Sequence, residues 1–445
     1  MKKTNLLIAV SFILSSVVSA QSKQPGSKTS KQSGADILHQ WNKTITTAMV
    51  SDGFHPKLAS RTYTYPNIAA YEVLVNFHPD YRSLQGQLNG LDSLPMIEAT
   101  KKYDKKICVA QAFSDVAKKL IYRPDRCDEL LASQIKMLTE QKHLDEETVA
   151  NSTDFGKKVA ERILVWVKKD SYNKTKAQPR YIFSNEPGKW KPTPPEYRSA
   201  CEPYWSILRT WAIKNVNDYI SPPTVPFSTD TNSQFYKNAK EVYLFSKNIT
   251  PEQKAIAIFW DDNPDLMTFT GHFPKPRRQM SPAAHWNGIA AIACKMKNKN
   301  LMETAAVYAL ISVAMADGFI VSFTEKYESN LVRPITYIRD NIDPEWNCLL
   351  VTPPFPEHTS GHSVISAAAA TVLTKIFGDN FNYSDNSEEE YGLQPRAFKS
   401  FLQAADEVSI SRFYGGIHYK TGIYAGMEQG KKIGKYINEE IKTRK

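Results

Sequence analysis

The chain has few cysteines, and none of them forms a recognised motif. Only 5 of its 445 residues are cysteine, at positions 108, 127, 201, 294 and 348. No two have CxxC spacing, which argues against a zinc ribbon or a thioredoxin-type site. In an exported chain the odd number leaves at least one thiol unpaired. Proximity in the sequence alone favours a disulfide between Cys108 and Cys127.

Dense blocks of one charge sign are also missing. The chain carries 56 Lys and Arg against 46 Asp and Glu, a net charge of +10, without the Lys/Arg block that tracks nucleic acid. We therefore expect no nucleic-acid partner. The mild positive excess is compatible with anionic substrates, and equally with the ordinary surface of a basic periplasmic protein.

Alternating runs of β-branched residues, which would predict strands, are scarce throughout. Apolar residues instead recur at three- and four-residue spacing, which is typical of helices, over 35–47, 60–76, 107–121 and 145–168. Helical periodicity resumes near residue 234 and continues to the C-terminus. The sequence therefore predicts an all-α fold built from helical bundles.

The composition divides the chain into five segments. Residues 1–20 have a basic start, an apolar run and a small-residue cleavage site, which together predict a signal peptide and a secreted or periplasmic chain of about 425 residues. Residues 21–34 are polar and predict a disordered linker. Residues 35–171 form an N-terminal helical region, and 234–445 a C-terminal helical catalytic domain. Between them, 172–233 hold nine prolines and three tryptophans, which predicts an ordered connection wrapping the surface.

The longest apolar run, 305–323, is long enough to raise the question of a membrane span. Asp317 interrupts it, and a charge in mid-span costs roughly 2.5–3.5 kcal/mol on insertion. We therefore predict a buried core helix rather than an integral membrane protein, and Asp317 then needs a partner.

The first segment with chemical character continues that helix to Lys326 and Arg333. Seven residues are close to two helical turns, which would place both cations on one face about 10 Å apart. Pro334 disfavours helical conformation at the residue before it, so the helix is expected to end at Arg333. Two cations at the end of a buried helix suit an anion, although an exposed basic face would give the same pattern.

The second segment is Ser360-Gly361-His362, followed by an Ala-rich helix. Ser is a preferred N-cap and Gly admits a ligand close to the backbone, so the first amides of the helix would face an anion. His362 would then stand beside the anion, ready to exchange a proton near neutral pH. His358 and His362, four apart, also suggest zinc, but the loop residues around them do not place both on one helical turn.

The third segment runs from Arg412 to His418. Arg412 supplies a planar fork that matches two oxygens of a tetrahedral anion. Two glycines at 415 and 416 allow a tight turn before His418. Together the three segments offer three cations, a helix N-terminus and two histidines.

Lys-x6-Arg-Pro, Ser-Gly-His and Ser-Arg-x5-His, in this order, resemble the superfamily of vanadium-dependent haloperoxidases and type 2 phosphatidic acid phosphatases. The first half resembles the bacterial haloperoxidase branch at 61–73, 190–195 and 259–262. The resemblance implies that Lys326, Arg333 and Arg412 neutralise the oxygens of vanadate or phosphate, with Ser360 and the Gly361 amide as donors. It makes His362 the general acid–base and His418 the axial residue on vanadium, or the nucleophile of a phosphatase.

The resemblance also places Phe355 in a halide pocket and leaves open whether Asp262 or Asp317 orients a basic partner. One departure stands out: the family usually has an acidic residue four after the axial His, where this chain has Gly422. Such an acid would fix the tautomer of the imidazole.

Three functions follow from the resemblance. The first is a vanadate-dependent haloperoxidase acting on hydrogen peroxide and a halide, the second is a periplasmic acid phosphatase for phosphate monoesters, and the third is a degenerate oxyanion-binding homologue. The sequence does not specify an oligomeric state.

Overall fold

Helices dominate the structure, a computed structural model that describes residues 34–264, 267–270, 272–276 and 278–445. The predicted signal peptide lies outside the described residues, as does the predicted linker apart from Gly34. Within them, strands form only two short antiparallel hairpins, β1 (Met267–Thr270) with β2 (Phe273–Pro276) and β3 (Tyr383–Asp385) with β4 (Arg396–Phe398). The predicted all-α class is confirmed.

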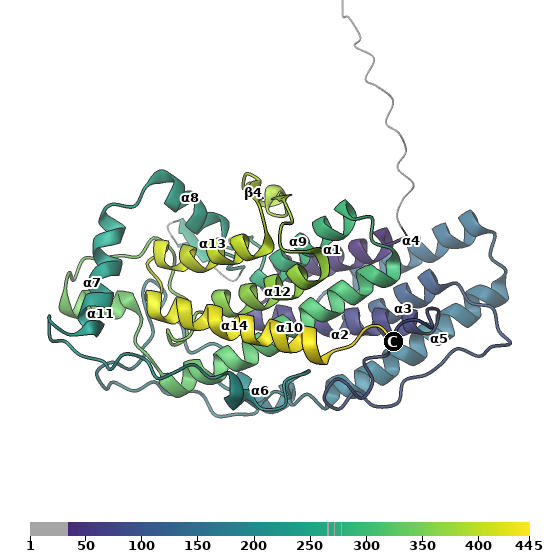
Figure 1. The fold of residues 1–445 in the computed structure, drawn as a ribbon, viewed down its shortest axis with the longest axis horizontal. Helices are drawn as coiled ribbons and strands as arrows, with labels where there is room; N and C mark the ends of the chain where they lie inside the picture. Colours follow the sequence, from purple (N-terminus) through teal and green to yellow (C-terminus); the bar gives the residue numbers. More distant parts are fainter. Residues whose placement is uncertain (1–33, 265–266, 271, 277) are drawn as a thin grey trace, which may run out of the picture. The chain divides into compact units, whose positions relative to one another are not determined.

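The N-terminal helices pack on one another and on the central helix of the C-terminal half (Figure 1). Each predicted helix is present within a few residues, and a further one follows the third. They are α1 (Asp36–Ser51), α2 (Pro56–Val75), α3 (Lys105–Ala117), α4 (Asp125–Lys142) and α5 (Glu146–Lys168).

The proline-rich segment after α5 has little regular structure but is anchored by its aromatics. It contains one short helix, α6 (Tyr172–Lys176), and two 3-10 turns, η1 (Trp205–Ile207) and η2 (Val216–Tyr219). Trp190, Trp205 and Trp211 are fully buried, which explains why a chain that cannot form long helices still has a defined path.

The C-terminal half supplies the remaining helices. They are α7 (Gln234–Lys247), α8 (Pro251–Phe259), α9 (Pro282–Met296), α10 (Leu301–Ser329), α11 (Pro334–Asn341), α12 (Gly361–Phe377), α13 (Phe401–Tyr414) and α14 (Lys420–Glu440), with a 3-10 turn, η3 (Glu389–Tyr391). In Figure 1, α10, α12 and α14 run beside one another, and α10 also contacts α2, so one hydrophobic core joins the two halves.

Helix α10 is the centre of this core. A capping box between Asn300 and Glu303 starts it. It is long and apolar enough to cross a membrane, a test that buried core helices also pass, and 94% of its most apolar window is buried inside the protein. Asp317 accepts hydrogen bonds from the backbone amides of Trp211, Ala212 and Ile213 at 2.6, 2.8 and 3.0 Å. The buried carboxylate therefore holds the proline-rich segment against the core.

Glycines set the close approach of α14 to α12. They recur every fourth residue along one face of α14, at Gly422, Gly426, Gly430 and Gly434. A Cβ atom at Gly426 would lie 2.7 Å from the carbonyl oxygen of Ser360. A Cβ atom at Gly430 would lie only 2.1 Å from the carbonyl oxygen of Val364. Because no side chain intervenes, α14 lies directly on the N-terminal turns of α12.

Gly430→Ala is expected to lower the free energy of unfolding by about 1–3 kcal/mol, because a methyl group must displace packed backbone. Urea denaturation followed by circular dichroism measures this change. The matched control is Gly318→Ala in α10, where a Cβ would meet its nearest neighbour at an ordinary 3.4 Å. Equal stability of the two variants would contradict the packing explanation.

The predicted Cys108–Cys127 disulfide is wrong. Both residues are buried free thiols on α3 and α4. Burial raises the pKa of each to about 12, so both behave as small core hydrophobes.

Candidate active site

The three segments singled out in the sequence converge at one buried place. Lys326 comes from the end of α10, Ser360 and Gly361 from the start of α12, and Arg412 and His418 from the end of α13 and the turn before α14. Lys326, Arg333 and Arg412 are at most 1% exposed, and His418 is 3% exposed. The pattern of cations and histidines that predicted an anion site is therefore gathered in the folded chain.

The helix geometry predicted for Lys326 and Arg333 is wrong. Helix α10 ends at Ser329, because Asn330 adopts the left-handed conformation (φ 47°) that terminates helices. Pro334 starts α11 instead of ending α10, and Arg333 is the extended residue before it. The two cations thus come from two elements that meet, rather than from one helix face.

Arg333 and His418 form the centre of the cluster. The guanidinium donates from Nε to the Phe355 carbonyl at 2.8 Å and from Nη1 to that of Ile417 at 2.8 Å. Nη1 also lies 3.1 Å from His418 Nε2. Because a guanidinium only donates, Nε2 must accept, which puts the ring proton of His418 on Nδ1. Nε2 is therefore the unprotonated ring nitrogen, and its lone pair accepts from Arg333.

Glu357 stands where the missing acid was expected to act. Its Oε1 accepts the Nδ1 proton of His418 at 2.7 Å and the Tyr419 amide at 3.1 Å. A Cβ at Gly422 would lie only 2.5 Å from this Oε1. An acid at position 422 and Glu357 would therefore compete for one space, and the glycine leaves it to Glu357. Burial raises the pKa of Glu357, while His358, Arg333 and Lys326 oppose that effect.

Arg412 and His362 form the other side of the cluster. Arg412 donates from Nη2 to the Trp260 carbonyl and from Nη1 to that of Asp261 at 3.3 Å, and Nη1 is 3.4 Å from His362 Nε2. Burial lowers the pKa of His362 well below its usual value, and Arg412 adds to the effect. The pKa of His418 is also lowered well below its usual value, mainly by burial and next by the positive charge of Arg333. These effects favour the neutral form of both rings.

Lys326 and Ser360 already make contacts within the chain. The Lys326 ammonium donates to the carbonyls of Glu357 at 3.0 Å and Pro356 at 3.2 Å, and to that of Thr359. Burial lowers the pKa of Lys326 well below its usual value, and Arg333 adds to this. The Ser360 hydroxyl caps α12 by accepting the Ser363 amide, as its N-cap position predicted. Lys326 thus fixes the loop that leads into α12.

Lys57, at the start of α2, is a fourth buried cation that sequence reasoning missed. It is 1% exposed, and its Nζ lies 4.8 Å from the ring centroid of Phe355. Lys326 and Arg333 approach the same ring to 5.2 and 5.1 Å. Phe355, predicted for a halide pocket, is therefore surrounded by three cations. No local signal marked Lys57, because only the folding of α2 onto α10 brings it there.

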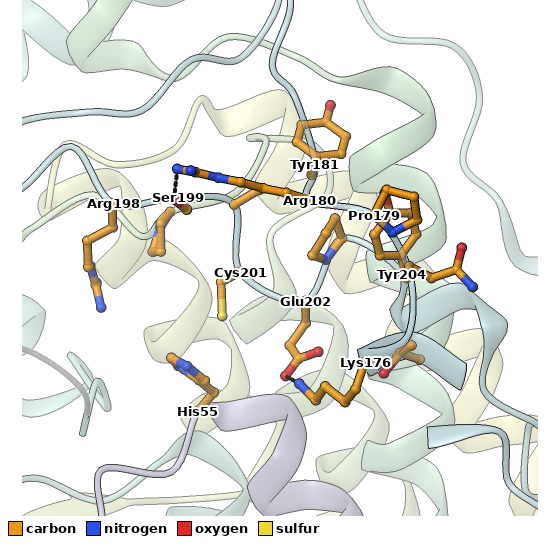
Figure 2. Close-up of a pocket in the computed structure, with 15 residues that line it drawn as sticks. His55, Lys176, Pro179, Arg180, Tyr181, Arg198, Ser199, Cys201, Glu202 and Tyr204 are labelled. Carbon is orange, nitrogen blue, oxygen red and sulfur yellow. Dashed lines mark hydrogen bonds and ion pairs between the residues drawn. The ribbon is translucent and has the colours of Figure 1, made fainter. Parts of the chain in front are cut away.

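A small cavity of about 20 Å³ lies among these groups, lined among others by Lys57, Phe355, His362 and Arg412. It shares His55, Cys201 and Pro354 with an outer cavity of about 430 Å³. Figure 2 shows the outer cavity with Cys201 near the middle of the labelled side chains and His55 below it, and the basic side chains of Lys176, Arg180 and Arg198 around them. The shared residues place the outer cavity next to the buried cluster.

The donor set fits an oxyanion. Four buried cations lie in the cluster, and Arg333 Nη2 is buried with no hydrogen-bond partner among the described residues. A buried unpaired donor is costly, and buried like charges repel one another. A tetrahedral anion such as vanadate or phosphate would accept from the orphaned Nη2 and offset the positive charge.

The contacts of His358, Asp317 and Asp262 bear on two further questions from the sequence: the zinc site that the loop residues argued against, and the acid that orients a basic partner. His358 does not join His362 at a metal site, because its Nε2 is 3.0 Å from Glu325 Oε1 and 2.8 Å from the Ser221 hydroxyl. Asp317 does not orient a basic side chain of the site, because its oxygens accept three backbone amides. Asp262 does pair with a basic side chain, His285, which is outside the anion cluster.

Comparisons with known proteins identify the family and the fold. A family model described as the VCPO second helical-bundle domain matches residues 306–444. The crystal structure of the first bacterial vanadium-dependent iodoperoxidase is 39% identical, with a TM-score of 0.87, covering 92% of this chain and 97% of that one. A holo-type bacterial vanadium-dependent chloroperoxidase shares the fold at 17% identity, with a TM-score of 0.66 and coverage of 87% and 92%.

Two curated relatives match over short segments. Vanadium chloroperoxidase of Curvularia inaequalis is 30% identical over 93 residues, 18% of this chain and 15% of that protein. Vanadium-dependent bromoperoxidase of Corallina officinalis is 29% identical over 99 residues, 20% of this chain and 17% of that protein. These matches span less than a fifth of either relative. Since the iodoperoxidase is matched over almost its whole length, the chain belongs to the vanadium-dependent haloperoxidases.

Proposed function

We propose that the chain is a vanadate-dependent peroxidase that oxidises a halide, with iodide as the first candidate. The observation that carries the proposal is the lone pair of His418 Nε2, held by Glu357 and aimed among buried cations. Iodide is favoured because the relative matched over 97% of its length is an iodoperoxidase. The overall reaction combines hydrogen peroxide, a halide and a proton to give hypohalous acid and water.

Lys326, Arg333 and Arg412 would hold the vanadate oxygens, with the Ser360 hydroxyl and the Gly361 amide as further donors. His418 Nε2 would bind the vanadium. Bound vanadate supplies a Lewis acid that activates hydrogen peroxide. His362 would take up a proton and return it during turnover; burial and Arg412 lower its pKa here, and a bound anion would offset that effect.

The halide would reach this site from the outer cavity. Arg180 lies on that cavity and donates to the Ser199 hydroxyl at 2.9 Å, while Lys176 pairs with Glu202 (Figure 2). An excess of basic side chains raises the local concentration of anions. Phe355, ringed by Lys57, Lys326 and Arg333, would be the last contact of the halide.

The decisive experiment compares the purified chain with and without orthovanadate. Peroxide-dependent oxidation of iodide, bromide and chloride is measured beside hydrolysis of an aryl phosphate. Iodide oxidation that requires vanadate supports the proposal. Phosphate release that vanadate abolishes, without halide oxidation, would assign the phosphatase function. Neither activity, with vanadate still raising the melting temperature, would leave an oxyanion-binding protein.

The contribution of His362 and His418 to the stability of the vanadate-free protein is expected to fall as the pH drops below about 6.5. Buried acids such as Glu72, Asp317 and Glu388, whose pKa values are raised to about 7, 6 and 8, act in the opposite direction, so the histidine contribution is read from the difference between a variant and the wild type. The pKa values of His362 and His418 are lowered in the folded state, so below pH 6.5 the unfolded chain binds more protons and gains stability relative to the folded one. His39, whose pKa burial lowers to about 4, adds to the same slope. The measurement is the melting temperature between pH 8 and 4.5.

Two variants check the origin of this slope. The melting temperature of His362→Gln, measured relative to the wild type, should rise as the pH falls below 6.5, because one of the groups that resists protonation in the folded state is removed. His143→Asn is the control, since His143 is exposed and its left-handed backbone (φ 49°) suits asparagine. It is expected to keep the wild-type slope. A slope unchanged in His362→Gln would refute the assignment.

We also propose that the protein is exported through its N-terminal signal peptide. The supporting observation is the order of basic, apolar and small residues in 1–20. Mass spectrometry of the exported chain should show an N-terminus at Gln21. An intact N-terminus on a cell-retained protein would overturn this proposal.

A further inference from the structure

A second buried polar cluster lies outside the anion site. It consists of Asp262 from the turn after α8, His285 on α9, Asp385 at the end of β3, and Glu388 before η3. These side chains are 3%, 0%, 0% and 1% exposed. Three carboxylates thus surround one imidazole in the protein interior, a charge set that is not balanced by the histidine alone.

The ring of His285 is fixed from both sides. Its Nε2 lies 2.9 Å from Asp385 Oδ2, and Asp385 is itself held by the amide and hydroxyl of Ser387 at 3.1 and 2.6 Å. Its Nδ1 faces Asp262, at 3.0 and 3.2 Å from the two oxygens, and Glu388 Oε1 at 3.7 Å. One ring nitrogen thus has a well-braced partner, and the other faces two carboxylates.

Glu388 is the least well held member of this network, with only the 3.7 Å ion-pair contact to His285 and the neighbouring Asp262 carboxyl beside it. Both of its oxygens are buried, and among the described residues neither accepts a hydrogen bond from an N–H or hydroxyl donor. Burial raises the pKa of Glu388 to about 8; His285 opposes this, and Asp262 and Asp385 reinforce it. The carboxylates of Glu388 and Asp262 repel each other when both are ionised. Without a further cation, they can stay close only by sharing a proton. A divalent cation would satisfy both carboxylates at once.

We propose that Asp262, His285 and Glu388 bind a divalent metal ion, with Asp385 orienting the imidazole. A histidine that binds metal through one nitrogen and donates the other N–H to a carboxylate is a recurring arrangement. Ligands at about 2.1 Å in a tetrahedral site stand roughly 3.4 Å apart. The distances of 3.0 and 3.7 Å from Nδ1 to the two carboxylates bracket this value. One imidazole with two carboxylates suits Zn²⁺ or Mn²⁺.

The position of this site gives the metal a structural role. The Trp260 ring stacks on His285 with centroids 4.3 Å apart, and the carbonyls of Trp260 and Asp261 accept from Arg412. Asp262 adopts the left-handed conformation (φ 45°), which its side-chain contacts must stabilise. The metal would therefore pin the turn that orients Arg412, and would join α9 to the β3–η3 segment.

The test uses the full-length chain after dialysis against a chelator, without vanadate, so that it does not depend on haloperoxidase activity. Zn²⁺ or Mn²⁺ is added, and binding is measured by calorimetry, metal content by mass spectrometry and stability by thermal unfolding. We expect one ion per chain and a higher melting temperature. Absence of both would overturn the proposal and would identify the cluster as a proton-sharing network.

Glu388→Gln assigns the binding to this site. The amide has the shape of a protonated Glu388, so the metal-free variant is expected to fold, but to bind metal at least about 10-fold more weakly. The control is Glu389→Gln, one residue along and exposed. It is expected to bind like the wild type. Equal affinity in Glu388→Gln would place the metal elsewhere and overturn the proposal.

Discussion

His418→Ala is expected to lower vanadate-dependent halide oxidation by three orders of magnitude or more, roughly the scale seen when a residue that bonds to the reacting centre is removed. The reason is geometric. Arg333 and Glu357 hold the ring so that Nε2 carries a lone pair, and among the described residues no other neutral nitrogen lies within hydrogen-bonding distance of Arg333. The cations remain, so vanadate should still bind by charge, more weakly.

The two effects are separated by measuring turnover beside the vanadate-dependent rise in melting temperature. The alanine variant should lose turnover while retaining a smaller thermal shift, which shows that the fold and the cation cluster persist. His143→Asn, exposed at the end of α4, is the matched histidine control and should keep full activity. A fully active His418→Ala would refute the site assignment.

The parts of this site that sequence reasoning found are those with local signals. Ser360 before an Ala-rich stretch predicted the start of α12, since a cap and its helix are neighbours in the chain. The resemblance to the family's motifs identified the cations and the histidines as site residues. The end of α10 was misplaced because Asn330 can adopt the left-handed conformation before Pro334 acts.

The parts that were missed depend on contacts between distant segments. Lys57 reaches Phe355 only because α2 packs against α10. The acid that supports His418 comes from position 357, 61 residues away, because the glycine face of α14 lets the loop before α12 come so close. The four-residue glycine spacing was visible in the sequence, but it could not show which acid would fill the space.

Glu357→Ala is expected to lower halide turnover by about 10- to 100-fold, the usual cost of removing a group that orients a metal ligand. His418 would lose its Nδ1 acceptor, so the ring could rotate or change tautomer, and Nε2 would no longer be held as the lone-pair donor. Because Glu357 acts through His418, it is a positioning residue. The vanadate concentration needed for half-maximal activity should rise together with the loss of turnover.

Gly422→Asp distinguishes positioning from a merely structural role. In the wild-type background the new side chain would meet the Glu357 carboxylate at about 2.5 Å, so this single variant should also lose activity. In the Glu357→Ala background the same change supplies a carboxylate four residues after His418, in space that has been vacated. Two harmful substitutions are therefore expected to restore much of the turnover when combined, a coupling that independent effects cannot produce. Glu357→Gln adds a second check, since an amide oxygen can still accept from Nδ1 and should retain more activity than alanine. If the double variant is no better than Glu357→Ala, Glu357 and the acid expected at position 422 do not serve the same purpose, and the support of His418 must have another source.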